Sequence, residues 1–145
     1  MVAEKLAKKF NADTERLIDR RKRTGPVGFS RAGKDALAGN LTEIEPLVLD
    51  PQNYDIILIG TPSWFGNVTP AVRTFVTQYD DVSSKKIGLF GTTNKTGVEN
   101  ALVQLAELIS DKQTIEYPTL PLQSRDLNEK VLNKKIDLFY KKLVP

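Results

Sequence analysis

The sequence predicts an α/β fold in which a mostly parallel sheet lies between two layers of helices (α/β/α). Short apolar runs alternate with amphipathic segments along the chain, which is typical of βαβ units. The two strongest runs, residues 54–60 and 86–91, are almost unbroken in apolar character. Such runs are expected of parallel strands that are covered on both faces. The length of 145 residues fits one domain, which we assign to residues 1–145.

The N-terminal third predicts few regular elements. Apolar residues fall on one helical face from Val2 to Phe10, so the chain is expected to open directly in a helix. Residues 14–18 are predicted to form a short strand. Residues 20–53 are rich in glycine and proline and are expected to be irregular, with one helical turn near residues 31–37.

The remaining elements are predicted from caps and periodicity. Thr69 and the following proline predict a helix start after the first strong strand, and residues 98–109 form a strongly amphipathic helix. Polar and apolar residues alternate over residues 114–117, as is expected of an edge strand. Asp126 and Glu129 form a predicted capping pair that opens a last helix, which runs to the C-terminal region.

Composition excludes several kinds of site. The chain has no histidine and no cysteine, which excludes His-based triads, thiolate nucleophiles and cysteine zinc sites. We therefore assign no catalytic side chain and no metal site. No apolar run approaches the ~20 residues of a membrane span, and Glu4 and Lys5 interrupt the apolar positions of the first ten residues. These observations predict a cytoplasmic protein without a membrane partner.

Charge is concentrated near the N-terminus. The net charge is +3, but residues 1–34 carry ten Lys and Arg and four Asp and Glu, a local +6. The densest run is residues 19–23, with four basic side chains. Such a run can bind phosphate-rich partners, but no aromatic residues are interleaved with it for base stacking. We therefore favour a solvated loop and predict no nucleic-acid partner.

Two loops carry the features of a ligand site. Residues 60–69 and 91–97 each follow a predicted parallel strand, begin with Gly-Thr and lead into a helix. In open parallel sheets, ligands bind beyond the carboxyl ends of the strands, and helix N-termini there offer N–H donors. The first loop also holds Trp64 and Phe65. We expect Trp64 to be presented for stacking on a flat ring and Phe65 to pack within the loop.

The stretches YDIILIGTPSWFGNVTPAVRTFV (54–76) and KKIGLFGTTNKTG (85–97) resemble the flavodoxin family. Members of this family are FMN-binding domains with a five-stranded parallel sheet in the order 2-1-3-4-5. The resemblance implies an FMN cofactor and a role in electron transfer or as an oxidoreductase. It implies that one side of the isoalloxazine ring lies against Thr61, Pro62, Ser63, Trp64, Phe65 and Gly66. The residues expected at the pyrimidine end and the other face are Thr92, Thr93, Asn94, Lys95 and Gly97.

The chain departs from the family pattern at its start. The family begins with its central strand and the FMN phosphate loop, which lead into the first helix, whereas Met1 to Glu4 already resemble that helix, so the strand and the loop are expected to be missing. Three arrangements can close the resulting gap: residues 14–18 pair directly with 54–60, a second molecule fills the slot, or the native chain starts further upstream. Because exposed edges promote association, we expect a homodimer through this edge. Without the phosphate loop, FMN is expected to bind weakly or not at all unless assembly rebuilds the site. A substitute for the loop would have to come from the N-terminus of the first helix or from basic residues such as Lys95 or Arg31.

Other functions remain open from the sequence. A degenerate flavodoxin-fold protein that binds no flavin would act through self-association or protein partners. A flavin-dependent reductase of quinones or similar acceptors also fits, since the basic surface differs from that of small acidic electron carriers. The redox partner is not specified. A phosphoacceptor domain is disfavoured, because Asp55 lies at the wrong end of its strand and Asp19 is a poor candidate.

Overall fold

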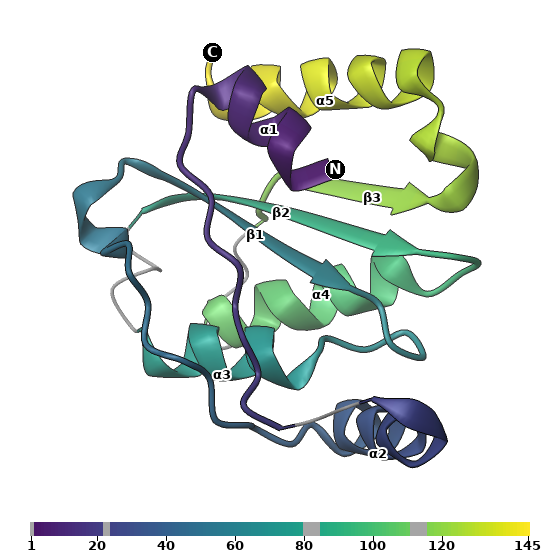
Figure 1. Ribbon diagram of the computed structural model, residues 1–145. Coiled ribbons are helices and arrows are strands. Elements are labelled where there is room, and N and C mark those ends of the chain that lie inside the picture. Colours follow the sequence, from purple (N-terminus) through teal and green to yellow (C-terminus); the bar gives the residue numbers. More distant parts are fainter. Residues whose placement is uncertain (1, 22–23, 80–84, 111–115) are drawn as a thin grey trace.

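The computed structural model describes residues 2–21, 24–79, 85–110 and 116–145. Two helices come before the first strand, and strands and helices then alternate to the C-terminus (Figure 1). The elements are α1 (Val2–Phe10), α2 (Gly25–Ala38), β1 (Ile56–Pro62), α3 (Pro70–Gln78), β2 (Lys86–Thr93), α4 (Val98–Ile109), β3 (Thr119–Gln123) and α5 (Glu129–Leu143). Two short 3-10 turns are η1 (Pro51–Asn53) and η3 (Ser124–Leu127).

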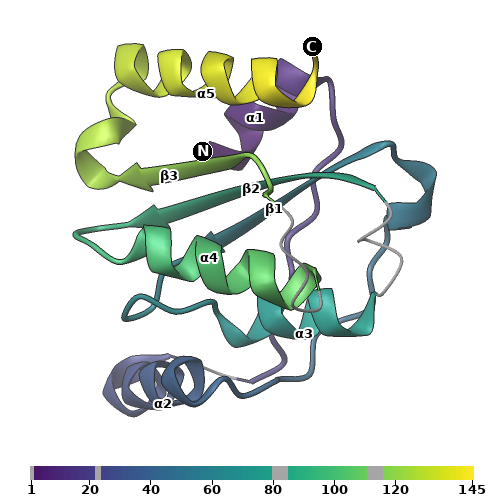
Figure 2. The ribbon, with the colours of Figure 1, turned by 180° about the vertical axis from the view of Figure 1, so that it is seen from behind.

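The three strands form one parallel sheet in the order β1-β2-β3. In the register of the two parallel pairs, Ile59 lies beside Leu89, and Phe90 lies beside Leu120. Helices α1 and α5 cover one face of the sheet, and α3 and α4 cover the other, as Figures 1 and 2 both show. The predicted α/β/α architecture is therefore confirmed. Helix α2 lies beyond α3, on the side away from the sheet.

Each face of the sheet has its own hydrophobic core. The core between the sheet and α3 and α4 contains Ile59, Val68, Val72, Phe75, Val76, Ile87, Leu89, Val98, Leu102, Leu105 and Ile109. The core between the sheet and α1 and α5 contains Val2, Leu6, Leu120, Leu122, Leu132, Ile136, Phe139 and Leu143. Both faces of the strands are thus buried, which explains why residues 54–60 and 86–91 show no polar alternation. Among the described residues, no helix has the length and apolar character needed to cross a bilayer.

The two edges of the sheet differ. The Asp55 carbonyl accepts a bond from Lys86 N–H, so odd-numbered residues of β1 face β2. The N–H and C=O groups of Leu58 and Gly60 consequently face outward, and no described strand pairs with them. On β3, the Pro118 carbonyl accepts from Leu89 N–H, so Pro121 faces the outer edge. Its missing N–H removes no bond to β2, and a proline there obstructs an added strand.

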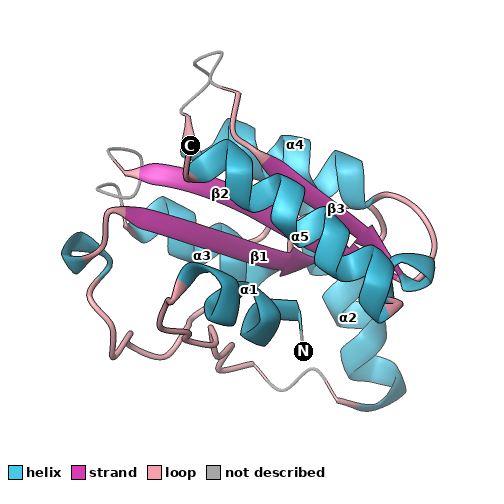
Figure 3. Ribbon diagram, turned by 90° about the horizontal axis from the view of Figure 1, so that it is seen from above, coloured by secondary structure: helices cyan, strands magenta, loops and turns pink. Residues whose placement is uncertain are grey.

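The structure corrects two predictions in the N-terminal third. Residues 14–18 form no strand and do not pair with β1; the chain there crosses the β1 edge on its way to α2 (Figures 1 and 3). Nearby, Asp19 and Ile44 form an isolated antiparallel bridge. Residues 25–38 form a full helix rather than a single turn. The helix ends at Gly39, which has φ 67°, and Asn40 N–H donates to the Asp35 carbonyl there.

Three predictions in the second half also need correction. The last strand is β3, not residues 114–117; residues 116–117 form no strand, and 114–115 lie outside the described residues. Asn128 caps α5 by accepting from Lys130 N–H, whereas Asp126 belongs to the preceding η3 turn. Thr69 precedes α3, as predicted, but its side chain makes no capping bond. Its hydroxyl lies 3.4 Å from that of Thr61.

Candidate functional site

Three loops leave the carboxyl ends of the strands. They lie together at one end of the sheet, the end to which all three arrows point in Figure 3. They connect β1 to α3, β2 to α4, and β3 to α5. This convergence follows from the parallel arrangement, since parallel strands end on the same side. The first two loops contain the residues predicted from the sequence. The third, residues 123–128, was not predicted as part of the site.

The first loop is built around a tight two-residue turn. Trp64 N–H donates to the Asn67 carbonyl at 3.1 Å, and Asn67 N–H donates back to the Trp64 carbonyl at 3.0 Å. The two residues between them, Phe65 and Gly66, both have positive φ, at 52° and 77°. This is the pattern of a type I′ turn, in which glycine is common and phenylalanine is rare. The turn therefore holds the Phe65 side chain in a conformation that a bulky residue seldom adopts.

The first and second loops are joined directly. Ser63 N–H donates to the Thr92 carbonyl at 2.8 Å, and the Ser63 hydroxyl donates to the Gly97 carbonyl at 3.2 Å. A Cβ on Gly97 would lie 2.9 Å from the Gly66 Cα, so glycine is required for this approach. The Asn100 side chain also donates to the Gly66 carbonyl at 2.6 Å. The two predicted loops thus form one continuous rim.

The remaining predicted site residues divide into buried and accessible groups. The Thr61 side chain is buried, and its hydroxyl donates to the Pro62 carbonyl at 2.8 Å, so Thr61 shapes the loop from inside. Thr93 is half-buried and donates to the Thr96 carbonyl at 3.2 Å. Asn94 and Lys95 are exposed at the tip of the second loop. Within the described residues, their backbone N–H groups make no hydrogen bond, which leaves two donors for a ligand.

Of the two aromatic side chains of the first loop, Phe65 differs from the expectation. Trp64 is only half-buried, as a surface-presented indole can be, but Phe65 is the more exposed of the two, at 64% of its surface. The Phe65 ring does not pack within its own loop. It lies against Gly33 of α2, where a Cβ would stand 2.7 Å from the ring. The unpredicted length of α2 explains the difference, because α2 brings Gly33 to this loop.

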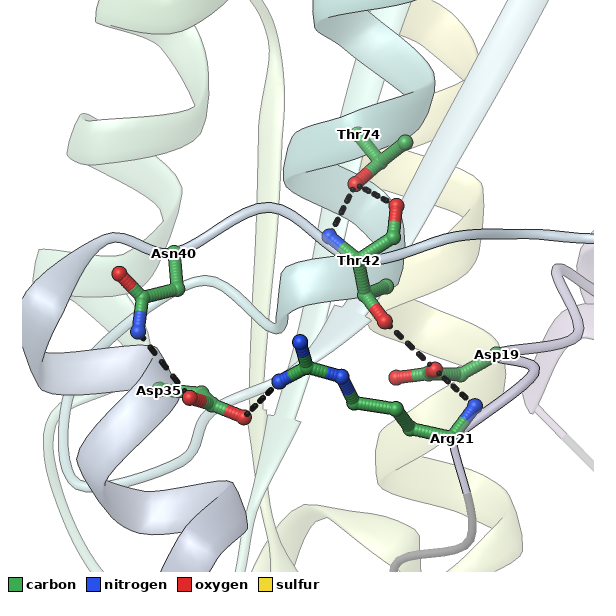
Figure 4. Close-up of polar contacts among 6 residues, drawn as sticks. All are labelled: Asp19, Arg21, Asp35, Asn40, Thr42 and Thr74. Atoms are coloured by element: carbon green, nitrogen blue, oxygen red, sulfur yellow. Dashed lines mark hydrogen bonds and ion pairs between the residues drawn. The ribbon is translucent and has the colours of Figure 1, made fainter.

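Polar contacts fix α2 beside the sheet layers (Figure 4). The buried Asp35 carboxylate accepts from Asn40 at 3.0 Å and from Arg21 at 3.4 Å. After α2, Thr42 N–H donates to the Thr74 hydroxyl of α3 at 2.9 Å, and that hydroxyl donates back to the Thr42 carbonyl. The Asp19 carboxylate accepts from the Thr42 hydroxyl at 2.7 Å. These bonds tie α2 to α3 and so hold Gly33 under the Phe65 ring.

Two of the four basic side chains in the run of residues 19–23 form ion pairs within the protein. Arg21 is bound to Asp35, and Arg20 pairs with Glu43, while residues 22–23 lie outside the described part of the chain. Two of the four cations are therefore used within the protein. Burial also lowers the pKa of Arg73 on α3, whose Nε finds no partner among the described atoms. A group of three or more metal-binding side chains is not found among the described residues.

The third loop adds Ser124 and Asp126 to the rim. The Ser124 hydroxyl donates to Asn94 Oδ1 at 3.4 Å and so connects the third loop to the second. The Asp126 carboxylate accepts from Gln123 N–H at 2.9 Å and pairs with Lys135 of α5 at 3.0 Å. The spacing of Gln123 and Asp126 is that of a capping box and could have indicated this turn. Asp126 therefore fixes the third loop instead of facing a ligand.

Acid is expected to loosen the third loop. The backbone bond from Gln123, and then Lys135, lower the pKa of Asp126 below its ordinary value of 3.8. The folded state then releases this proton more readily than the unfolded state, so the carboxylate stabilises the fold above about pH 5 and less as the pH falls through the lowered pKa. Urea unfolding of Asp126→Asn should show a stability deficit near pH 7 that shrinks below about pH 4. A deficit that is independent of pH would contradict this role.

Two solved structures are similar to this chain over most of its length. The crystal structure of a flavoprotein in complex with FMN from Lactobacillus acidophilus matches with a TM-score of 0.65 and 20% identity, over 84% of this chain and 80% of that one. A protein from Bacteroides eggerthii, named as a flavoprotein, matches with a TM-score of 0.73 and 18% identity, over 95% of this chain and 87% of that one. The fold is flavodoxin-like.

The flavodoxin-like fold confirms the resemblance that residues 54–76 and 85–97 indicate. No protein-family model matches the sequence. At 18–20% identity, the likeness establishes the fold and leaves the ligand to be argued from the site. In this chain the flavodoxin-like sheet consists of three described strands, with β1 at an edge.

Proposed function

We propose that this flavodoxin-like chain binds a flavin, FMN or a close relative, on the rim formed by its first and second loops. The observation that carries the proposal is the joined pair of turns at Ser63–Gly97 and Gly66–Gly97. They place the half-buried Trp64 indole and free backbone N–H groups at the carboxyl end of the sheet. The FMN complex of the similar Lactobacillus protein supports a flavin over other planar ligands.

The residues present fit the ring better than the phosphate. Backbone donors at Asn94 and Lys95 suit the polar edge of a heteroaromatic ring, and small residues such as Gly66 and Gly97 allow a ring to approach the backbone. The N–H groups of Asn94 and Lys95 are also the successive free donors that a phosphate would need, and the ring edge and the phosphate cannot both take them. The exposed Lys95 provides one positive charge close to the ring donors.

A bound flavin would supply one- or two-electron transfer, which is consistent with a chain that has no histidine or cysteine. The protein's own residues then have three tasks. The N–H groups at the second loop orient the polar edge of the ring, while Trp64 shields a face of it from water. The bonds of Ser63 and Asn100 hold the two loops at a fixed separation. We infer an oxidoreductase or electron carrier from this arrangement.

Titration with FMN and with riboflavin tests the proposal. Flavin fluorescence should be quenched to saturation by the purified protein with both ligands. Because the ring edge takes the second-loop donors, FMN should bind no more than about tenfold more tightly than riboflavin. Emission that stays unchanged for both ligands up to high protein concentration would refute flavin binding. A much larger preference for FMN would show that a phosphate site exists.

The outward edge of β1 favours a second candidate function, self-association. The N–H and C=O groups of Leu58 and Gly60 are unpaired among the described residues, and β1 has no charged side chain. Such an edge promotes pairing with a second copy. Residues 11–18 cross this edge, and Tyr54 donates to Asp13 there at 2.7 Å, so that segment would have to shift. A colourless protein that sediments as a dimer would favour this function over the first.

A further inference from the structure

Three apolar side chains form an exposed row along α2. Phe29 and Leu37 are 68% and 66% exposed, and Gly33 lies midway between them at the helical spacing of four residues. The Phe65 ring covers Gly33 and lies 6.1 Å from the Phe29 ring, centroid to centroid. We call Phe29, Phe65 and Leu37 the α2 row. Exposed apolar side chains are common singly, whereas a contiguous row is typical of a binding surface.

Two locally destabilising features hold the Phe65 ring in this row. The positive φ of Phe65 is strained for a bulky residue. Gly33 also weakens α2 relative to alanine, but a Cβ there would collide with the ring. Both features keep an aromatic ring on the surface and add no buried core. They are therefore explained better by a bound partner than by stability.

The exposed charged side chains of α2 are both positive. Arg31 and Lys34 lie on the exposed side of α2, and neither has an ion pair within the described part of the chain. The one carboxylate of α2, Asp35, is buried and bonded to Arg21 and Asn40 (Figure 4). The exposed face of α2 thus presents apolar side chains and two unpaired cations without an anion. Such a face is complementary to an acidic one.

We propose that the α2 row, with Arg31 and Lys34, is the docking surface for a protein partner that presents apolar side chains surrounded by carboxylates. Aromatic residues on such a surface serve as anchors that lose water on binding, and arginine and lysine at the rim steer an acidic partner. A second copy of this chain is disfavoured, because a two-fold contact through α2 gathers Arg31 and Lys34 of both copies in one interface without an exposed carboxylate of α2. The partner would lie beside the first loop, and the inference does not depend on flavin binding.

Two labelled peptides test the inference. Both are amphipathic helices of about 20 residues with the same leucine and phenylalanine positions; the polar face carries glutamates in one and lysines in the other. Fluorescence anisotropy should show binding of the acidic peptide, weakened by salt, and little binding of the basic one. The double variant Phe29→Ala, Leu37→Ala should weaken acidic-peptide binding by roughly thirtyfold, as loss of an interface anchor does.

The variants separate docking from folding and from flavin binding. Leu138→Ala on α5 removes an equally apolar exposed side chain from another surface and should leave peptide binding unchanged. Gly33→Ala should displace the Phe65 ring and weaken peptide binding, while the thermal stability of the fold is maintained or raised. Equal binding of the two peptides, tighter binding to anionic vesicles of phosphatidylglycerol than to the acidic peptide, or full binding by the double variant would overturn the proposal.

Discussion

Gly97→Ala is expected to weaken flavin binding by roughly tenfold or more. Gly97 has φ 95°, which disfavours any residue with a Cβ. The added Cβ would also lie 2.9 Å from the Gly66 Cα, and that contact is between backbone atoms that cannot rotate away. The loops would have to separate, and Ser63 would lose its bond to the Gly97 carbonyl. Titration with riboflavin measures the effect without a contribution from the phosphate.

Gly25→Ala is the matched control. Gly25 also has a positive φ, at 75°, but a Cβ there meets no described atom within 4 Å. This variant carries a similar backbone strain without the contact between the loops. It should lose stability and keep flavin affinity. If both variants weaken binding equally, general destabilisation and not loop separation is the cause.

Phe139→Ala is expected to cost about 3–5 kcal/mol in the free energy of unfolding, a large part of a typical domain's margin. Phe139 is 2% exposed and lies in the core shared by α1, α5 and the sheet. Its ring also contacts that of Phe10 edge-on at 6.2 Å, so the cavity would loosen α1 as well. Urea unfolding followed by far-UV circular dichroism measures the loss.

The adjacent residue provides the control for this cavity. Leu138 lies on the same helix and is 54% exposed, so Leu138→Ala should change the free energy of unfolding by less than about 1 kcal/mol. The two variants share the helix and nearly the same change in helix propensity. Comparable losses in both would contradict the assignment of the α5 face that packs on the sheet.

Sequence periodicity predicted the strands that are buried on both faces and the helices that bury one apolar stripe. The apolar run of residues 56–59 and the spacing from Val98 to Ile109 each allow few alternatives, and both segments form the expected element. Thr69 and Pro70 place the start of α3 correctly because a proline fits a first turn whatever the capping bonds are.

Tertiary contacts decided the elements that were missed. Gly28 and Gly33 reduce the helix signal of residues 25–38, but Gly33 is needed under Phe65, a residue 32 positions away. Residues 14–18 have strand-like composition, yet a strand exists only beside a partner strand, and none is described there. The position of the Phe65 ring could not be predicted either, because α2 and the first loop meet only in the folded chain. The two candidate ligand loops, in contrast, could be located because parallel strands dictate where they lie.

The proline on the outer edge of β3 limits how copies of this chain can assemble. If two sheets joined through their β1 strands, Pro121 would terminate the combined ladder at both ends. A third copy would find no complete row of donors to extend, so growth would stop at a closed pair and not continue as a fibril. A single residue at the opposite edge of the sheet would therefore prevent the exposed β1 edge from starting open-ended aggregation.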